Sequence, residues 1–332
     1  MENVSRETFS INLLFPGMSQ AVEKEQGGTS LVVDLLTTLR QDRYSLTGWW
    51  RFLRRSWEMS RKTANDNPSL KRSWMLVTLL VGAFALTILL ANFLFEGPGM
   101  TVRLLPAFLF CIAWQQSDLF WHLGLNTQVQ SGTLLPTIGI ANTLTWLRGL
   151  AASYLLARII GGVATPSWLA LTAFLAGVVT DILDGQVARL SKTQSKLGQI
   201  ADGEADFCLY LALTIILSQN NVLPLWVGLV MLLRFCVPLM AALGSYFLFA
   251  RPVRFGSTTW GKYAGLAQCL YLLVLLAPPQ FAPIVQPIHI PLLVVTLSLL
   301  IVAPLAQILE NIRGICYNAN NEQCSQKGRL QR

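Results

Sequence analysis

The sequence predicts an all-α protein that crosses a membrane several times. Its 332 residues are 53% hydrophobic and only 13% charged, and the mean hydropathy is +0.50. Soluble domains carry about 25% charged residues, so this composition excludes an ordinary soluble protein. Apolar segments long enough to cross the hydrocarbon core, which takes about 20 residues, recur along the chain.

The first 72 residues are predicted to form a cytoplasmic region. Residues 1–30 lack a long apolar core, so we expect no cleavable signal peptide. Between Arg40 and Arg72 nine lysines and arginines stand against three acids. Four tryptophans are interleaved with them: Trp49, Trp50, Trp57 and Trp74. This pattern is typical of a segment on an anionic lipid surface, or of a topology signal alone. In either case the expected partner is the membrane, not a nucleic acid.

Eight apolar segments can be placed as membrane helices. Two of them form an accessory segment (73–130), at 73–95 and 104–123. The second is interrupted by Pro106 and by polar residues, so an interfacial or re-entrant helix is the alternative. The other six form a predicted core (about 135–315), at 142–161, 167–188, 200–218, 222–250, 262–279 and 291–311. A tail (316–332) follows.

The charges of the connecting segments predict the orientation. Lysine and arginine occur in the links at 189–198 and 251–262 and in the tail, whereas 162–166, 219–221 and 280–290 carry neither. Links rich in lysine and arginine normally stay in the cytoplasm. We therefore expect an integral, multi-pass protein with these basic links, and a site beside the first of them, at the cytoplasmic face.

A run of acids interrupts the apolar core: Asp181-Ile-Leu-Asp184-Gly185-Gln-Val-Ala188-Arg189, followed by Gly198, Asp202 and Asp206. On a helix Asp181 and Asp184 share one face, and Asp202 and Asp206 share a face of the next helix. Ionisable groups at membrane depth are costly and mark functional cavities. Four carboxylates stay ionised together only beside cations, and all-oxygen ligands suit Mg²⁺, Mn²⁺ or Ca²⁺. The sequence predicts a divalent-metal site.

The histidines and cysteines predict little chemistry of their own. Only His122 and His289 occur, each isolated, and the six cysteines show no metal-ligand or redox spacing. A histidine-rich metal site is therefore not expected.

The acidic run resembles the complete signature of the CDP-alcohol phosphatidyltransferase family (class I), Asp-x2-Asp-Gly-x2-Ala-Arg-x8-Gly-x3-Asp-x3-Asp. The segment from Asn142 through Thr145 to Arg148 also resembles the first-helix motif of that family, which usually has proline where this chain has Ala141. The resemblance covers a little over half of the chain. It implies a transferase of phospholipid biosynthesis that moves a phosphatidyl group from CDP-diacylglycerol to an alcohol acceptor and releases CMP. It also implies a homodimer.

The resemblance implies roles for the matching residues. Asp181, Asp184 and Asp202 would hold two divalent ions, Mg²⁺ or Mn²⁺, against the donor diphosphate. Asp206 would border the ions and take the proton from the acceptor hydroxyl. The CDP part of the donor would be bound by Asn142, Thr145, Gly185, Ala188, Arg189, Ser195 and Gly198.

Three further cations are candidates for binding a phosphorylated acceptor such as glycerol 3-phosphate or inositol phosphate. Arg234 interrupts an apolar segment, and Arg254 and Lys262 flank the entry to the next one. Buried arginines often pair with carboxylates or phosphates. For Arg254 and Lys262 an ordinary topology signal is the alternative.

Two other functions stay open. A CDP-choline or CDP-ethanolamine:diacylglycerol phosphotransferase of the same family would share the signature. A cation transporter would explain the carboxylates, since these also mark ion pathways, but it would leave Gly185, Ala188, Arg189 and Gly198 without a reason.

Overall fold

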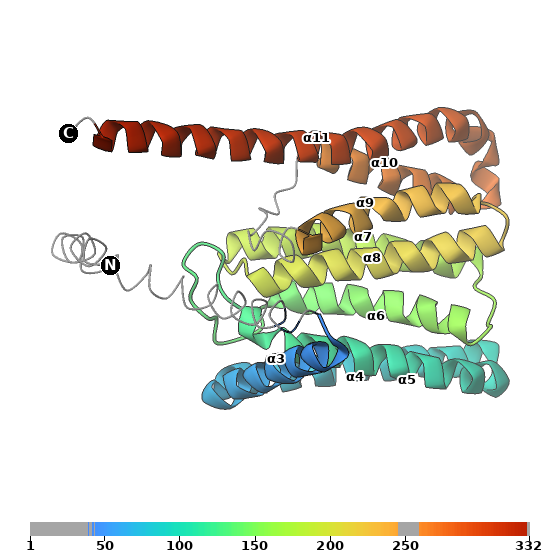
Figure 1. Cartoon of the computed structure of the whole chain (residues 1–332). Helices are drawn as coiled ribbons and strands as arrows, with labels where there is room; N and C mark the ends of the chain where they lie inside the picture. Colours follow the sequence, from blue (N-terminus) through green and yellow to red (C-terminus); the bar gives the residue numbers. More distant parts are fainter. Residues whose placement is uncertain (1–38, 40–41, 43, 245–258, 331–332) are drawn as a thin grey trace. The chain divides into compact units, whose positions relative to one another are not determined.

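The computed structural model describes residues 39, 42, 44–244 and 259–330, and their regular structure is helical (Figure 1). The helices of eight or more residues are α3 (Leu46–Asp66), α4 (Pro68–Glu96), α5 (Pro98–Trp121), α6 (Ile140–Ile160), α7 (Ser167–Leu190), α8 (Lys196–Gln219), α9 (Leu225–Gly244), α10 (Thr259–Leu275) and α11 (Ala282–Leu330). The prediction of an all-α protein is confirmed for this part of the chain.

Each of the eight predicted segments corresponds to one helix, from α4 to α11. Within the described residues, three helices are long and apolar enough to cross a membrane: Pro68–Glu96, Ser167–Leu190 and Pro279–Ala306. The protein is therefore membrane-like in composition and helix length, while the count of six core spans stays a prediction.

The chain forms two compact units. The first consists of residues 1–164 and 175–209, and the second of residues 165–174 and 210–332. Helices α7 and α8 contribute residues to both units. The predicted carboxylates and the accessory helices all belong to the first.

The accessory segment is a helical hairpin. Helix α4 ends at Gly97, which adopts φ +89°, and α5 begins with Pro98 at its first position. Glycine tolerates this left-handed conformation, and proline has no amide hydrogen to lose at a helix start. One residue therefore suffices to separate the two helices.

Helix α5 runs unbroken through Pro106, and each of its two glutamines makes one hydrogen bond to a neighbouring helix. The Gln115 amide donates to the carbonyl of Trp146 in α6 at 2.7 Å. The Gln116 carbonyl accepts from the Thr78 hydroxyl in α4 at 3.0 Å. A Cβ on Gly149 would lie 2.5 Å from Gln115 Nε2, so the glycine permits this approach. Close packing and interhelical hydrogen bonds hold helices together in lipid, where the hydrophobic effect does not drive their association.

A buried arginine ties α6 to the end of α4. The Arg158 guanidinium is almost completely buried and donates to Glu96 (2.7 Å), to Asn92 (3.2 Å) and to the hydroxyl of Tyr154 (3.1 Å). It also donates to the carbonyl of Ala164. Removing one partner of a buried ion pair costs about 3–5 kcal/mol, so this network fixes the register between the two helices.

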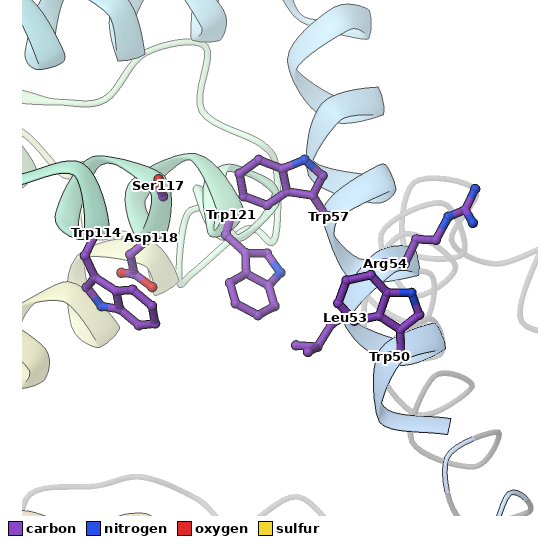
Figure 2. Close-up of a pocket in the computed structure, with 8 residues that line it drawn as sticks. All are labelled: Trp50, Leu53, Arg54, Trp57, Trp114, Ser117, Asp118 and Trp121. Carbon is purple, nitrogen blue, oxygen red and sulfur yellow. The ribbon is translucent and has the colours of Figure 1, made fainter. Parts of the chain in front are cut away.

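An aromatic groove lies between α3 and α5 (Figure 2). Its cavity has a volume of about 440 Å³ and is lined by Trp50, Leu53, Arg54, Trp57, Trp114, Ser117, Asp118 and Trp121. The Trp121 indole N–H donates to the Ser56 hydroxyl at 2.6 Å, and the Ser60 hydroxyl donates to the carbonyl of Trp121. These bonds dock α3 against the end of α5.

A different side of α3 carries exposed cations. Arg51, Arg55 and Lys62 follow one another at i, i+4 and i+11 and thus fall on one side of the helix. Apolar α4 begins at Pro68, just after α3 ends. An aromatic side and a basic side are what a helix at a membrane surface needs; the contact with anionic lipid stays a prediction.

In the second unit α10 packs against α11 and α11 against α9. The buried Gln268 amide donates to the carbonyl of Met231 in α9 at 3.3 Å. The Thr296 hydroxyl of α11 donates to the carbonyl of Ala267 in α10 at 3.3 Å. Polar side chains thus join the helices here as they do in the first unit.

Candidate metal and donor site

The site forms where α7 ends and α8 begins. A short link, 191–195, joins the two helices, and Lys192 in it adopts φ +53°. The hydroxyl of Ser195 accepts from the amide of Gly198 at 3.0 Å, which caps the start of α8. The link is held from outside by the 126–134 loop, because the Val129 amide donates to the carbonyl of Gln194 at 2.9 Å.

The four aspartates meet around the guanidinium of Arg148 from α6. Its Nη1 donates to Asp181 Oδ1 at 2.8 Å, and its Nη2 donates to Asp202. Nη2 also lies 3.6 Å from Asp184 Oδ2, and Nε lies 3.5 Å from Asp206 Oδ1. The structure therefore brings all four carboxylates together, and it adds a cation that the sequence had not assigned to the site.

The side chains at the site range from fully buried to half exposed. The Arg148 side chain is 0% exposed and that of Asp184 only 9%, whereas Asp181 and Asp202 are 50% and 45% exposed. Arg148 and Asp184 thus form a dry floor, and Asp181 and Asp202 an accessible rim.

The carboxylates fit a divalent cation. One oxygen from each of Asp181, Asp202 and Asp206 can be chosen so that all three lie within 4.8 Å of one another. Four carboxylates against the one guanidinium of Arg148 leave a formal excess of three negative charges. Hard divalent ions prefer such oxygen ligands. Asp184 stands apart from the trio, because it accepts from the Thr145 hydroxyl at 2.8 Å.

The predicted donor residues of α6 lie next to those of the link. The Asn142 amide donates to the Ser195 hydroxyl at 3.0 Å, and both side chains are buried. A Cβ on Gly198 would lie 2.4 Å from Oδ1, the side-chain oxygen of Asn142. Asn142, Ser195 and Gly198 are therefore in direct contact, and Thr145 stands one turn further along α6, on Asp184.

The remaining donor candidates lie on the last turns of α7. The Arg189 guanidinium folds back towards Gly185, where an added Cβ would lie 3.4 Å from its Nη1. Ala188 is partly buried beside them. A methyl group at Gly185 would therefore only touch the arginine, at ordinary van der Waals distance.

The acceptor candidates are placed only in part. Arg234 and Lys262 belong to the second unit, and Arg254 lies outside the described residues. Arg234 Nη1 donates to Gln268 Oε1 at 3.3 Å, and its guanidinium lies 5.3 Å from the Phe235 ring centroid. Lys262 is exposed at the start of α10.

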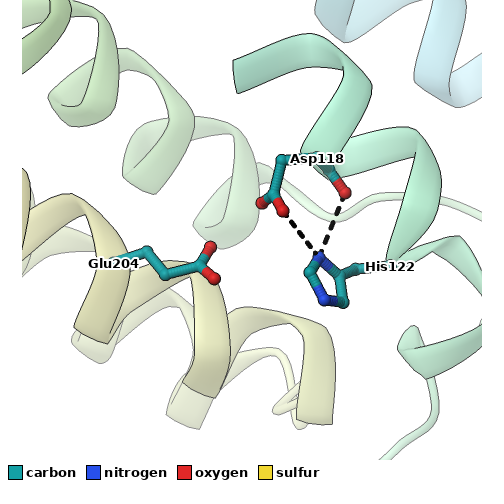
Figure 3. Close-up of side chains that lie close together, drawn as sticks. All are labelled: Asp118, His122 and Glu204. Atoms are coloured by element: carbon teal, nitrogen blue, oxygen red, sulfur yellow. Dashed lines mark hydrogen bonds and ion pairs between the residues drawn. The ribbon is translucent and has the colours of Figure 1, made fainter. Parts of the chain in front are cut away.

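A second group of ionisable side chains lies between α5 and α8 (Figure 3). Glu204 stands between Asp202 and Asp206 in the sequence but points to Asp118 and His122 of the accessory segment. His122 Nδ1 lies 3.1 Å from Asp118 Oδ1 and 3.1 Å from the carbonyl of Asp118. Sequence reasoning missed this group, because no local pattern connects Glu204 with residues some 80 positions earlier.

Arg148 was named in the first-helix motif but was given no role at the site, although its spacing carried a signal. Asn142, Thr145 and Arg148 recur at every third position of α6 and so lie on neighbouring turns of one side. Their contacts with Ser195, Asp184 and Asp181 show that this side of α6 meets the start of α8 and the end of α7.

Comparison with known proteins gives a family and two relatives. The profile of the CDP-alcohol phosphatidyltransferase family matches residues 138–303. A cardiolipin synthase (CMP-forming) of Streptomyces coelicolor is 35% identical over 113 residues, which cover 33% of this chain and 51% of that protein. A CDP-diacylglycerol–glycerol-3-phosphate 3-phosphatidyltransferase of Cereibacter sphaeroides is 34% identical over 146 residues, 41% of this chain and 62% of that protein. The chain thus spans about half to three fifths of these relatives. No solved structure matches it.

The family match covers half of the chain and begins just before α6. It includes Arg148 and all four aspartates, whereas α3, α4 and α5 precede it. The chain belongs to the CDP-alcohol phosphatidyltransferase family, as its acidic signature had indicated.

Proposed function

We propose that the protein transfers a phosphatidyl group from CDP-diacylglycerol to an alcohol and releases CMP. The observation that carries this proposal is the convergence of four aspartates from α7 and α8 on one point inside the family-matched region. The names of both relatives support it, since one describes a CMP-forming synthase and the other a CDP-diacylglycerol-dependent transferase.

In the proposed reaction the acceptor hydroxyl oxygen attacks the phosphatidyl phosphorus. The bond from that phosphorus to the CMP oxygen breaks, CMP departs, and the hydroxyl proton passes to Asp206. Asp181, Asp184 and Asp202, with Asp206 at their border, would hold two divalent ions, Mg²⁺ or Mn²⁺. These ions would neutralise charge on the diphosphate and on the departing CMP. Asn142, Ser195 and Gly198 would form the wall against which the CDP group rests, with Thr145, Gly185, Ala188 and Arg189 next to it.

Substitution of the base should reduce the rate far more than donor binding. We expect Asp206→Asn to lower kcat by about 10²- to 10⁴-fold, the range that a general base contributes, and to change the donor KM by less than about threefold. The measurement is CMP release by the purified protein with CDP-diacylglycerol and Mg²⁺ or Mn²⁺, with chelator as a blank.

The matched control for this experiment is Glu204→Gln on the same helix, because Glu204 points away to α5. Its activity should stay within about twofold of the original. An Asp206→Asn variant as fast as the original would show that another group takes the proton. Metal-independent CMP release would contradict the proposed metal site. No CMP release from CDP-diacylglycerol with any acceptor would leave the two alternatives, a CDP-choline or CDP-ethanolamine phosphotransferase and a cation transporter.

The contact between Gly198 and Asn142 should set donor affinity. Gly198→Ala places a methyl group 2.4 Å from the side-chain oxygen Oδ1 of Asn142. The Asn142 side chain then has to move, and its hydrogen bond to Ser195 is disturbed. We expect the donor KM to rise by about tenfold, the loss of one or two hydrogen bonds. Gly203→Ala is the control, since no atom lies within 4 Å of its added Cβ. Equal donor KM values for the two variants would show that Asn142 and Ser195 do not bind the donor.

The proposed acceptor is a phosphorylated alcohol, with glycerol 3-phosphate first. The name of the Cereibacter relative supports this choice, as does Arg234, a partly buried cation that Gln268 holds in place. Arg254 and Lys262 are further candidates.

A panel of acceptors tests this choice. We expect CMP release with glycerol 3-phosphate or inositol phosphate but not with inositol, serine or choline. Arg234→Gln should raise the KM of the phosphorylated acceptor by about tenfold or more, with the donor KM unchanged. Turnover with CDP-choline and diacylglycerol would instead establish the phosphotransferase alternative.

The active site is proposed to face the cytoplasm, because Lys192 lies in the link between α7 and α8 and Lys196 begins α8. A Lys192→Cys variant should react with a membrane-impermeant maleimide in inside-out vesicles and not in right-side-out vesicles, after the natural cysteines are replaced by alanine or serine. Labelling only in right-side-out vesicles would reverse the orientation. The homodimer implied by the resemblance stays a prediction.

A further inference from the structure

Arg148 has no role among those assigned to the signature residues, although it contacts all four aspartates. Its guanidinium lies between 2.8 and 3.6 Å from Asp181, Asp184 and Asp206 and donates a short hydrogen bond to Asp202. Its side chain is 0% exposed. A buried guanidinium keeps its charge under all conditions, so it is a permanent cation at the centre of the tetrad.

This cation stands where divalent ions would have to bind. Asp181 and Asp202 each accept a hydrogen bond from Arg148, and both belong to the trio whose oxygens lie within 4.8 Å of one another. A Mg²⁺ ion needs oxygens at about 2.0–2.1 Å. The guanidinium and an ion would thus compete for the same carboxylates and would repel each other across them.

The contacts of Arg148 are incomplete in a way that fits a movable group. Its Nε–H is buried and donates no hydrogen bond, because Asp206 Oδ1 lies 3.5 Å away. A buried donor without an acceptor is rare and unfavourable. The two hydrogen bonds of the guanidinium therefore both come from its terminal nitrogens, and both lead to the exposed carboxylates of Asp181 and Asp202.

We infer that Arg148 is a resident counter-cation of the tetrad. It holds the four carboxylates together before metal binds, and it yields its bonds to Asp181 and Asp202 when divalent ions enter. Arg148 thereby sets both the stability of the metal-free protein and the metal concentration that the site requires. This inference rests on the proposed function in one respect, namely that the tetrad is the metal site.

The test is the binding of Mn²⁺, measured as the loss of the free-ion EPR signal, together with thermal unfolding in chelator and across a Mn²⁺ titration. The proteins are the full-length original and the Arg148→Gln and Arg148→Lys variants. We expect Arg148→Gln to half-saturate at a Mn²⁺ concentration at least about tenfold lower than the original protein does, because a positive charge in direct contact with the carboxylates is removed. Its melting temperature should fall in chelator and recover with Mn²⁺. Arg148→Lys should lie between the two.

Arg158→Gln is the matched control, because Arg158 is an equally buried arginine of the same helix with its ion pair elsewhere. It should lower the melting temperature equally with and without Mn²⁺ and leave the half-saturation unchanged. If Arg148→Gln does not fold without metal, it is purified in Mn²⁺ and unfolding is followed after chelator is added, while Arg148→Lys supplies the binding curve.

The outcomes separate this inference from the proposed function. The Asp181→Asn/Asp202→Asn double variant tests the metal site itself. If it binds as much Mn²⁺ as the original protein, the proposed metal site is wrong. If the original protein binds more Mn²⁺ than this double variant, but Arg148→Gln and Arg148→Lys bind it as tightly as the original or more weakly, the metal site stands and the counter-cation is refuted. Tighter binding with a metal-dependent melting temperature supports it.

Discussion

The polar groups buried on helix α6 must find partners inside the protein, and the first unit is arranged around this constraint. A helix satisfies its own backbone in lipid, but a guanidinium on it needs a neighbour. Arg148 finds partners on α7 and α8, and Arg158 finds them on α4. The backbone carbonyl of Trp146 accepts a hydrogen bond from the Gln115 amide of α5. Each neighbouring helix is thus tied to α6 at a defined height, which apolar packing alone would not specify.

The same constraint shapes the chemistry of the site. Because Arg148 and Asp184 are buried while Asp181 and Asp202 reach solvent, the local dielectric constant falls from the rim of the site to its floor. Charges on the floor act more strongly on one another than charges on the rim. The carboxylates of Asp181 and Asp202 are open to solvent, while the buried pair of Arg148 and Asp184 joins α6 to α7.

Much of the helical framework and the members of the site could be predicted, because each leaves a local trace in the sequence. Helix length appears as an apolar run, and a shared helix face appears as spacing of three or four residues. Pairings between distant segments leave no such trace. The spacing of Asp181 and Asp184 reveals a common face, but not that Arg148 lies against it.

Helix α5 illustrates the same limit. Pro106 and the glutamines interrupt the apolar pattern of the segment. The groups of Thr78 and Trp146 that bond to the glutamines lie on other helices. Proline is tolerated in a helix when its surroundings compensate for the lost bond. The sequence of the segment shows Pro106 and the glutamines, but it does not show the partners on other helices that make a continuous helix possible.

The position of the α4–α5 hairpin in the chain has a consequence for biogenesis. Because Glu96 and Asn92 precede Arg158 by more than 60 residues, the ribosome delivers the partners of the arginine before the arginine itself. A lone arginine in a bilayer is strongly disfavoured. Here the hydrogen-bond partners Glu96 and Asn92 are synthesised before Arg158. The accessory hairpin is thus already synthesised when α6, the first helix of the family-matched region, emerges. A truncated chain that starts at residue 138 would contain Arg158 without Glu96 and Asn92.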